Sequence, residues 1–347
     1  MAELTYEISS NELANNTDWK YTDGNGTEFN LDSFLGLNED KAPVIVFVVI
    51  STVLCLLSAG ANLLSMIAIQ HIPGNSTPIH MLYINLAVAD MMGAVATFVS
   101  QIGTRISFNW VRDIPTLNVL GHTDAVGFVL LVFFYCGSAF TLLIFSILRY
   151  VAIAYPLKYS AIFTKKNIFV FVTICWIVSA VISAPGLCGI IFKRNPHCKP
   201  WNYVWPCIIG GVFIAVVALY ARVSRGLWSR SNSAVSEHQA DDNYKAFVTT
   251  LILTSTLLIS MLPFVIFKIL RLHAEQTDKI TPFVFNNFIC YLPYINFLSD
   301  PLVYGARTRD VREGYKHLLQ SMGLNKEYDR RLQDGISAAK QTEDTGV

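Results

Sequence analysis

The stretch Phe145–Tyr159, "FSILRYVAIAYPLKY", places a single arginine, Arg149, at the end of a long apolar run. No charged residue occurs from Ala125 to Leu148. Such a run is long enough to cross a bilayer core of about 30 Å as a helix. An ionisable side chain at that depth costs free energy unless it is paired or hydrated. Arg149 is therefore a candidate functional residue at a membrane boundary.

Six further apolar runs accompany this one. The 347-residue chain is 53% hydrophobic and only 15% charged, and its mean hydropathy is +0.43. A large soluble helical protein would show amphipathic stripes, whereas these runs are apolar on every side. The sequence predicts an all-α membrane protein, a seven-transmembrane helix bundle. The runs lie at Val44–Gln70, Met81–Thr104, Ala125–Ile153, Asn167–Ile191, Trp201–Ala221, Ala246–Phe267 and Thr281–Ala306.

The first 42 residues form a polar segment with nine acidic residues and no signal-peptide layout. This segment contains glycosylation sequons at Asn15 and Asn25, which can be used only outside the cell. Lys and Arg are slightly more numerous on the opposite side of the membrane. We therefore expect a multi-pass plasma-membrane protein. Its regions would be an extracellular amino-terminal tail (1–42), a transmembrane domain (43–306), an amphipathic helix (307–322) and a cytoplasmic tail (323–347).

Two of the seven cysteines, Cys188 and Cys198, flank the short connection after the fourth run. That connection lies on the oxidising side if the amino terminus is outside. A disulfide there would close a short ring and restrain the unbound loop. The alternative is a pair of free thiols.

Two acidic residues lie inside apolar runs. Asp90 is the sole charge of the second run and Asp300 the sole charge of the seventh, and Asn296 precedes Asp300 by one helical turn on the same face. Paired carboxylates can hold a cation such as sodium or share a proton; a polar cluster that only fixes helix packing is the alternative. Pro263 and Pro301 each remove a backbone donor, which predicts hinges in the sixth and seventh helices.

Taken together, these residues resemble the rhodopsin-like (class A) G-protein-coupled receptors over about residues 44–320. The resemblance rests on motifs that occur one per helix in the family's order. Their residues are Asn62 in "SAGANLL", Asp90 in "LAVAD", "LRY" at 148–150 followed by "AYPLKY", Trp176, Tyr220, Pro263, and "DPLVY" at 300–304.

The resemblance implies a role for each matching position. Arg149, beside Tyr150, would rearrange on activation and contact a heterotrimeric G protein, and Tyr220 and Tyr304 would swing toward it. Asp90, Ser138, Asn296 and Asp300 would form an allosteric sodium site. After Tyr304, a segment with apolar residues among basic ones predicts an amphipathic eighth helix on the membrane surface. Its apolar or aromatic residues are Val311, Tyr315, Leu318 and Leu319.

The sequence also departs from the family pattern. Leu148 replaces the acid that ordinarily restrains the arginine, and Asp241 and Asp242 are displaced from the usual acidic position of the sixth helix. We therefore expect the inactive state to be held less strongly and basal signalling to be raised. Met261 replaces the tryptophan of the sixth helix, and the third helix lacks its usual cysteine. The missing third-helix cysteine, the cysteine pair within the loop, Val212 at the usual proline position of the fifth helix and "DPLVY" together look like the branch that holds melanocortin, lysophospholipid and cannabinoid receptors. The changed sixth-helix motif makes the protein a divergent member.

The expected ligand pocket is apolar and aromatic, with a basic rim. Leu131 occupies the position where amine receptors carry an acid, and no lysine lies in the seventh run, which disfavours an amine ligand and retinal. Lys268 can reach an anionic ligand or snorkel to water. The hypothesis is a lipid, peptide or other anionic small molecule, and simple helix packing is the alternative for any one residue. The pocket residues are Arg105, Phe128, Leu131, Val132, Tyr135, Phe264, Lys268 and Tyr294.

The sequence thus indicates a receptor for an extracellular ligand, and not an enzyme. No cofactor is expected besides the sodium ion, and no nucleic acid as a partner. Membrane lipids and a heterotrimeric G protein are the expected partners, and the last residues, Thr345 to Val347, resemble a PDZ-domain ligand. A signalling-silent scaffold or dimerisation partner is the first alternative, and an ion transporter or channel is the second.

Overall fold

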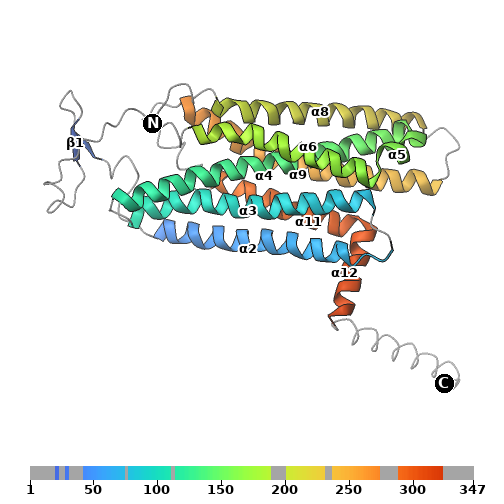
Figure 1. Cartoon of the computed structure of the whole chain (residues 1–347), viewed down its shortest axis with the longest axis horizontal. Helices are drawn as coiled ribbons and strands as arrows, with labels where there is room; N and C mark the ends of the chain where they lie inside the picture. Colours follow the sequence, from blue (N-terminus) through green and yellow to red (C-terminus); the bar gives the residue numbers. More distant parts are fainter. Residues whose placement is uncertain are drawn as a thin grey trace, which may run out of the picture.

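The computed structural model describes residues 20–22, 28–30, 42–74, 77–110, 114–188, 201–230, 237–273 and 288–322. Seven long helices of these residues lie side by side in one elongated bundle (Figure 1). Six of them are long and apolar enough to cross a membrane, and the seventh follows residues outside the description. The bundle helices are α2 (Ala42–Gln70), α3 (Pro78–Trp110), α4 (Ile114–Ala154), α6 (Lys165–Ser183), α8 (Trp201–Arg230), α9 (Glu237–His273) and α11 (Leu292–Arg307).

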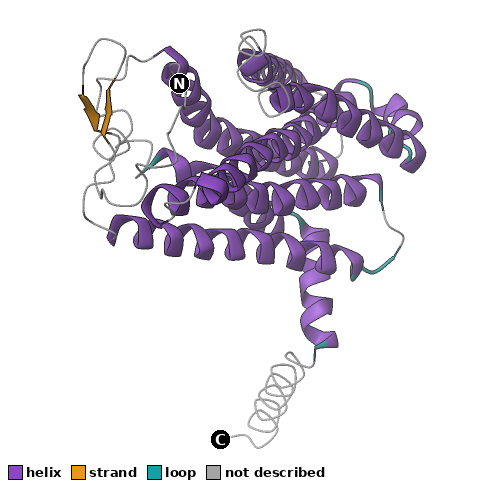
Figure 2. Cartoon of the chain, turned by 60° about the vertical axis from the view of Figure 1, so that its left-hand side comes forward, coloured by secondary structure: helices purple, strands orange, loops and turns teal. Residues whose placement is uncertain are grey.

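The shorter elements lie at the ends of the bundle (Figure 2). Helix α5 (Pro156–Ile162) follows α4, and α12 (Arg309–Ser321) follows α11. Two 3₁₀ turns, η1 (Ala184–Leu187) and η3 (Ile289–Tyr291), extend α6 and precede α11. The amino-terminal tail contains one element that was not predicted, an antiparallel hairpin of β1 (Lys20–Thr22) and β2 (Glu28–Asn30).

Several helix ends differ from the ends of the apolar runs. Helix α8 continues nine residues beyond Ala221 to Arg230, and α9 begins at Glu237 rather than at Ala246. A helix satisfies its own backbone hydrogen bonds, so it can extend from the membrane into water with charged residues on its surface. The α-helical part of the fourth crossing ends at Ser183, earlier than predicted, because Pro185 follows within the 3₁₀ turn η1.

Helix α4 is the centre of the bundle and packs against α3, α6, α8 and α9. Two hydrogen bonds link α4 to α3 and α3 to α6, its neighbours in the bundle. Asn85 in α3 donates a hydrogen bond from Nδ2 to Thr141 Oγ1 in α4 (2.7 Å), and its Oδ1 accepts one from Trp176 Nε1 in α6 (2.9 Å). Because these groups are withdrawn from water, their pairing favours one register of the three helices.

Helix α12 turns away from the bundle axis directly after α11 (Figure 1). Its amphipathic pattern is confirmed: Val311 and Leu318 are buried against the bundle, whereas Leu319 is 44% exposed on the outer face. The chain has no cysteine after Cys290 that could carry an acyl anchor. Protein contacts hold this helix against the bundle.

Three side-chain contacts and one glycine hold α12 in place. His80 Nε2 lies 3.4 Å from Asp310 Oδ2, the Tyr83 and Thr308 hydroxyls are 3.2 Å apart, and the Ser65 and Tyr315 hydroxyls are 2.6 Å apart. A Cβ on Gly314 would overlap the carbonyl oxygen of Ala68 in α2. The helix thus approaches α2 at backbone distance, and it docks through contacts from both α2 and α3.

Candidate functional site

Two buried acids meet in the middle of the bundle. Asp90 in α3 and Asp300 in α11 are both 0% exposed, and their carboxyl groups lie within electrostatic range of each other and of the Ser138 hydroxyl in α4. Among the described residues, none of the four carboxylate oxygens has a hydrogen-bond partner, and neither does Ser138 Oγ. Two bare carboxylates at close range repel one another, so this cluster requires a bound cation or a shared proton.

Amide groups surround the acids. Asn62 Nδ2 donates to the carbonyl oxygens of Ser58 (2.9 Å) and Phe297 (2.8 Å), which leaves Asn62 Oδ1 without a partner. Asn296 Oδ1 accepts a hydrogen bond from Ser260 Oγ (3.3 Å), which joins α9 to α11. The cluster therefore offers carboxylate, hydroxyl and amide oxygens, the ligand types that hard cations prefer. Within the described residues no group of three His, Cys, Asp or Glu side chains could hold a metal ion.

Arg149 lies at the end of α4, and its side chain is only partly exposed. Its Nε is buried without a hydrogen-bond partner, and it forms no ion pair with any residue in the described part of the chain. Leu148, its neighbour, is 0% exposed and packs in the main hydrophobic core. The expectation that no acid adjoins the arginine in α4 thus agrees with the structure; the side chains of Asp241 and Asp242 lie outside the description.

The short helix α5 brings an aromatic residue close to this arginine. The pKa of the Tyr159 hydroxyl lies above its usual value because the group is buried. The positive charge of nearby Arg149 offsets part of this rise. Leu157 in the same helix is 93% exposed. The sequence did not single out Leu157, because a leucine in a connection becomes conspicuous only when its exposure is known.

The residues expected to switch with Arg149 pack elsewhere in this structure. Tyr304 stacks on Tyr83 with ring centroids 5.0 Å apart, and Tyr220 lies 5.4 Å from Phe247. Both hydroxyls are buried without a partner, so neither binds Arg149. Tyr150 contacts Tyr155 of the α4–α5 connection, at 6.2 Å between ring centroids, and Pro263 and the buried Met261 lie within α9.

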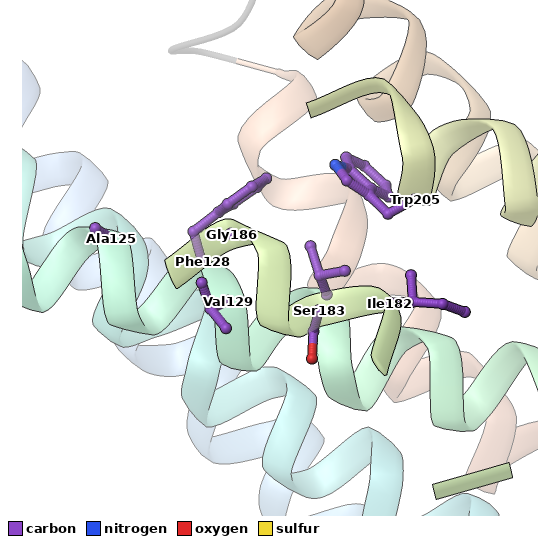
Figure 3. A pocket seen from close by; sticks show the side chains of 8 residues that line it. Ala125, Phe128, Val129, Ile182, Ser183, Gly186 and Trp205 are labelled. Atoms are coloured by element: carbon purple, nitrogen blue, oxygen red, sulfur yellow. The ribbon is translucent and has the colours of Figure 1, made fainter. Parts of the chain in front are cut away.

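Most of the expected pocket residues are packed together in one hydrophobic cluster, with Phe128 at its edge. Leu131, Tyr135, Phe264 and Tyr294 are each at most 3% exposed, and the hydroxyls of Tyr135 and Tyr294 have no partner. Phe128 and Trp205 rings meet edge to face, 6.1 Å apart, beside a small cavity (Figure 3). The side chains of Arg105 and Lys268 lie outside the description.

Three further predictions concern residues beyond the described ranges. Asn15, Asn25 and the carboxyl-terminal Val347 are among these residues. Cys188 is disulfide-bonded, but the expected partner, Cys198, also lies outside the described residues. Five cysteines are free, namely Cys55, Cys136, Cys175, Cys207 and Cys290.

Residues 61–304 match the family described as "7 transmembrane receptor (rhodopsin family)". The chain belongs to the rhodopsin family of seven-transmembrane receptors. This family accounts for the order of the motifs and for the seven-helix bundle around α4.

The relatives of this rhodopsin-family chain are distant from it. The octopamine receptor beta-1R of Drosophila melanogaster is 22% identical, with 94% of this chain and 72% of the relative covered. The galanin receptor 2b of Danio rerio is 26% identical (83% and 79%), and the cannabinoid receptor 2 of Rattus norvegicus is 24% identical (85% and 83%). A human melanocortin receptor 3 also matches, at 22% identity. The predicted family is therefore confirmed, with melanocortin and cannabinoid receptors among the relatives.

Membership of this family establishes the general activity of the protein. Proteins of this family are multi-pass membrane receptors that act through heterotrimeric G proteins, and they are not enzymes. The named ligands of the relatives differ in chemistry, so kinship does not assign a ligand to this chain.

Proposed function

We propose that this protein is a plasma-membrane receptor, with its amino terminus outside, that activates a heterotrimeric G protein and retains raised activity without a ligand. The observation that carries the proposal is Arg149, whose buried Nε has no partner while Leu148 fills the position of the restraining acid. A receptor exchanges between inactive and G-protein-binding states, and each contact that favours the inactive state lowers basal activity. Without an acid beside Arg149, the inactive state loses one such contact.

The G-protein contact would be made at the end of the bundle that carries Arg149 and α5. Arg149 supplies a positive charge there, and Leu157 supplies an exposed apolar side chain. Tyr220 and Tyr304, whose hydroxyls are unpaired, would become partners of Arg149 in the active state. Movement of α9 and α11 about Pro263 and Pro301 would open this end.

We propose that the ligand is an anionic amphiphile or an acidic peptide. Its apolar part would enter between α4, α9 and α11, where Tyr135 and Tyr294 hold buried hydroxyls without partners. Such hydroxyls cost free energy when they stay unpaired, so a ligand that accepts hydrogen bonds from them gains affinity. Leu131, which is 2% exposed, occupies the position in α4 where an acid would be needed to bind an amine.

A G-protein recruitment assay in cells, run against a library of lipids, peptides and nucleosides, tests this proposal. The unstimulated receptor should recruit G protein above the level of mock-transfected cells, and an anionic lipid or acidic peptide should raise the signal further. A signalling-silent scaffold would recruit none under any condition. Current through the membrane without G protein would favour a transporter or channel instead, and either result would contradict the proposal.

The buried acid pair would bind sodium and thereby favour the inactive state. Asp90, Ser138, Asn296 and Asp300 would hold the ion, with Asn62 beside them; the ion would supply the positive charge that lets both carboxylates stay ionised. A ligand that binds only the folded receptor stabilises it by about 2.7 kcal/mol at one hundred times its dissociation constant. Sodium should therefore raise the melting temperature of the purified receptor.

The test compares melting in sodium chloride and in choline chloride at equal ionic strength. The wild-type protein should melt at a higher temperature in sodium, and Asp90→Asn or Ser138→Ala should remove the difference. Thr97→Val is the matched control, because the Thr97 hydroxyl is buried in the same helix as Asp90 but bonds only the Gly93 carbonyl (2.8 Å). Equal melting of the wild-type protein in both salts would contradict a sodium site.

A further inference from the structure

An apolar cavity of about 90 Å³ lies between α4, the end of α6 and α8. Figure 3 shows the side chains of α4 and α6 on one side of it and the Trp205 indole on the other. This cavity adjoins the expected ligand pocket, with which it shares Phe128 and Val132, and it extends away from that pocket toward α6 and α8. Its lining residues are Ala125, Phe128, Val129, Val132, Ile182, Ser183, Gly186 and Trp205.

The surroundings of the cavity place it beside the bilayer. Helices α6 and α8 both pack on α4 but touch one another only slightly. Next to the cavity-lining Ile182, Val181 is 68% exposed on the outside of α6. In a membrane-spanning bundle that outside surface meets lipid chains. Because α6 and α8 make few contacts with each other, an acyl chain from the bilayer would reach the cavity between them.

The depth of the cavity in the membrane follows from the helix ends. Gly186 is one residue from the end of the apolar span Lys165–Leu187, and Trp205 is two residues from the start of the span Tyr203–Val223. These ends lie opposite to the end that carries Arg149. Tryptophan is enriched at this level of a membrane protein, where the polar headgroups meet the hydrocarbon.

The polar groups of the cavity indicate which kind of molecule can occupy it. Ser183 Oγ already donates a hydrogen bond to the Ala180 carbonyl (3.2 Å). The indole N–H of Trp205, a residue that is 7% exposed, makes no hydrogen bond with any described residue, and Figure 3 shows its nitrogen on the side of the ring toward Phe128. The other six lining residues offer only apolar side chains or, at Gly186, none. A hydrocarbon segment that carries one hydrogen-bond acceptor satisfies both the apolar walls and the free donor.

We propose that this cavity binds a membrane phospholipid, with the first methylene groups of an acyl chain inside it and the ester carbonyl accepting a hydrogen bond from Trp205 Nε1. The volume suits a short segment, since it equals about three groups of the size of a water molecule. The remainder of the chain would lie in the gap between α6 and α8. This binding is independent of the activating ligand proposed above, so its test needs no signalling readout.

The experiment uses the full-length receptor in lipid nanodiscs that contain a phosphatidylcholine with a diazirine near the carbonyl end of its acyl chain. After irradiation, mass spectrometry should find the label on the peptides with residues 125–132, 182–186 and 205, above the level on other lipid-facing peptides. Ala125→Phe fills the cavity and should reduce this label to that background level. Val126→Phe is the matched control, because Val126 is 41% exposed on α4 and does not line the cavity.

A second pair of measurements tests the hydrogen bond without filling the cavity. Trp205→Phe keeps an aromatic ring but removes the donor, and it should lower the labelling about fivefold, the ratio expected from one net hydrogen bond. An ether-linked probe, which lacks the carbonyl, should label the wild type and Trp205→Phe equally. Uniform labelling around the bundle, or unchanged labelling in Ala125→Phe, would overturn the proposal. Preferential labelling of the same peptides by a diazirine sterol would assign the cavity to a sterol and overturn the phospholipid assignment.

Discussion

Leu148→Asp should lower the basal G-protein activation of this receptor about tenfold, because a hydrogen bond between charged groups is worth about 1.5–3 kcal/mol and each 1.4 kcal/mol is a factor of ten. In the wild-type protein Arg149 has a buried, unpartnered Nε, and Leu148 contributes only apolar contacts. A carboxylate at position 148 would pair with the guanidinium and stabilise the inactive state. Reporter activity in unstimulated cells, normalised to surface expression, measures the effect.

Leu148→Asn is the control for this variant. Leu148 is 0% exposed, so any polar replacement will cost stability and lower expression. The asparagine has the same shape as the aspartate but no charge. Basal activity that falls equally in both variants would show that lost packing, and not a restored ion pair, is responsible, and it would contradict the account of a less strongly held inactive state.

Gly314→Ala should detach α12 from the bundle, although alanine is the better helix former. A new Cβ at this position would overlap the Ala68 carbonyl oxygen and lie 2.9 Å from Ile72 Cγ1. Because the first of these atoms belongs to the backbone of α2, α12 must move as a whole. Overpacking of this kind costs about 1–3 kcal/mol, so amide hydrogen exchange within α12 should become about thirtyfold faster for a loss of about 2 kcal/mol.

The contrast with a second glycine sharpens this prediction. A Cβ on Gly60 in α2 would meet nothing within 4 Å, so Gly60→Ala should stabilise its helix by about 1 kcal/mol through propensity alone. Gly314→Ala gains the same propensity but should show the opposite sign. Unchanged or slower exchange within α12 in Gly314→Ala would show that the helix is not docked against α2 as the structure has it.

The sequence predicted those features that depend on a residue's own chemistry. A charge in an apolar run is conspicuous, so Asp90, Arg149 and Asp300 could be recognised without a structure, and the proximity of the two acids agrees with that reading. The absence of an acid beside Arg149 could equally be read from Leu148. Such residues can be recognised in a sequence because burying a charge is costly wherever the helix lies.

Features that depend on how helices meet could not be predicted in this way. His80, Thr308 and Ser65 are ordinary polar residues until α12 folds back onto α2 and α3, and only then do they become its contacts. Gly314 was the one readable signal, since a glycine inside a short helix weakens it unless a close approach requires it. The cavity beside Trp205 depends on the spacing of α6 and α8, which no single residue encodes.

Nucleotide exchange on a purified heterotrimeric G protein, measured with the unliganded receptor in nanodiscs, tests the central claim most directly. The wild-type receptor should accelerate exchange severalfold over nanodiscs without receptor, Arg149→Ala should remove the acceleration, and Leu148→Asp should reduce it about tenfold. Exchange at the receptor-free rate with the wild-type protein, or acceleration that survives in Arg149→Ala, would contradict the account.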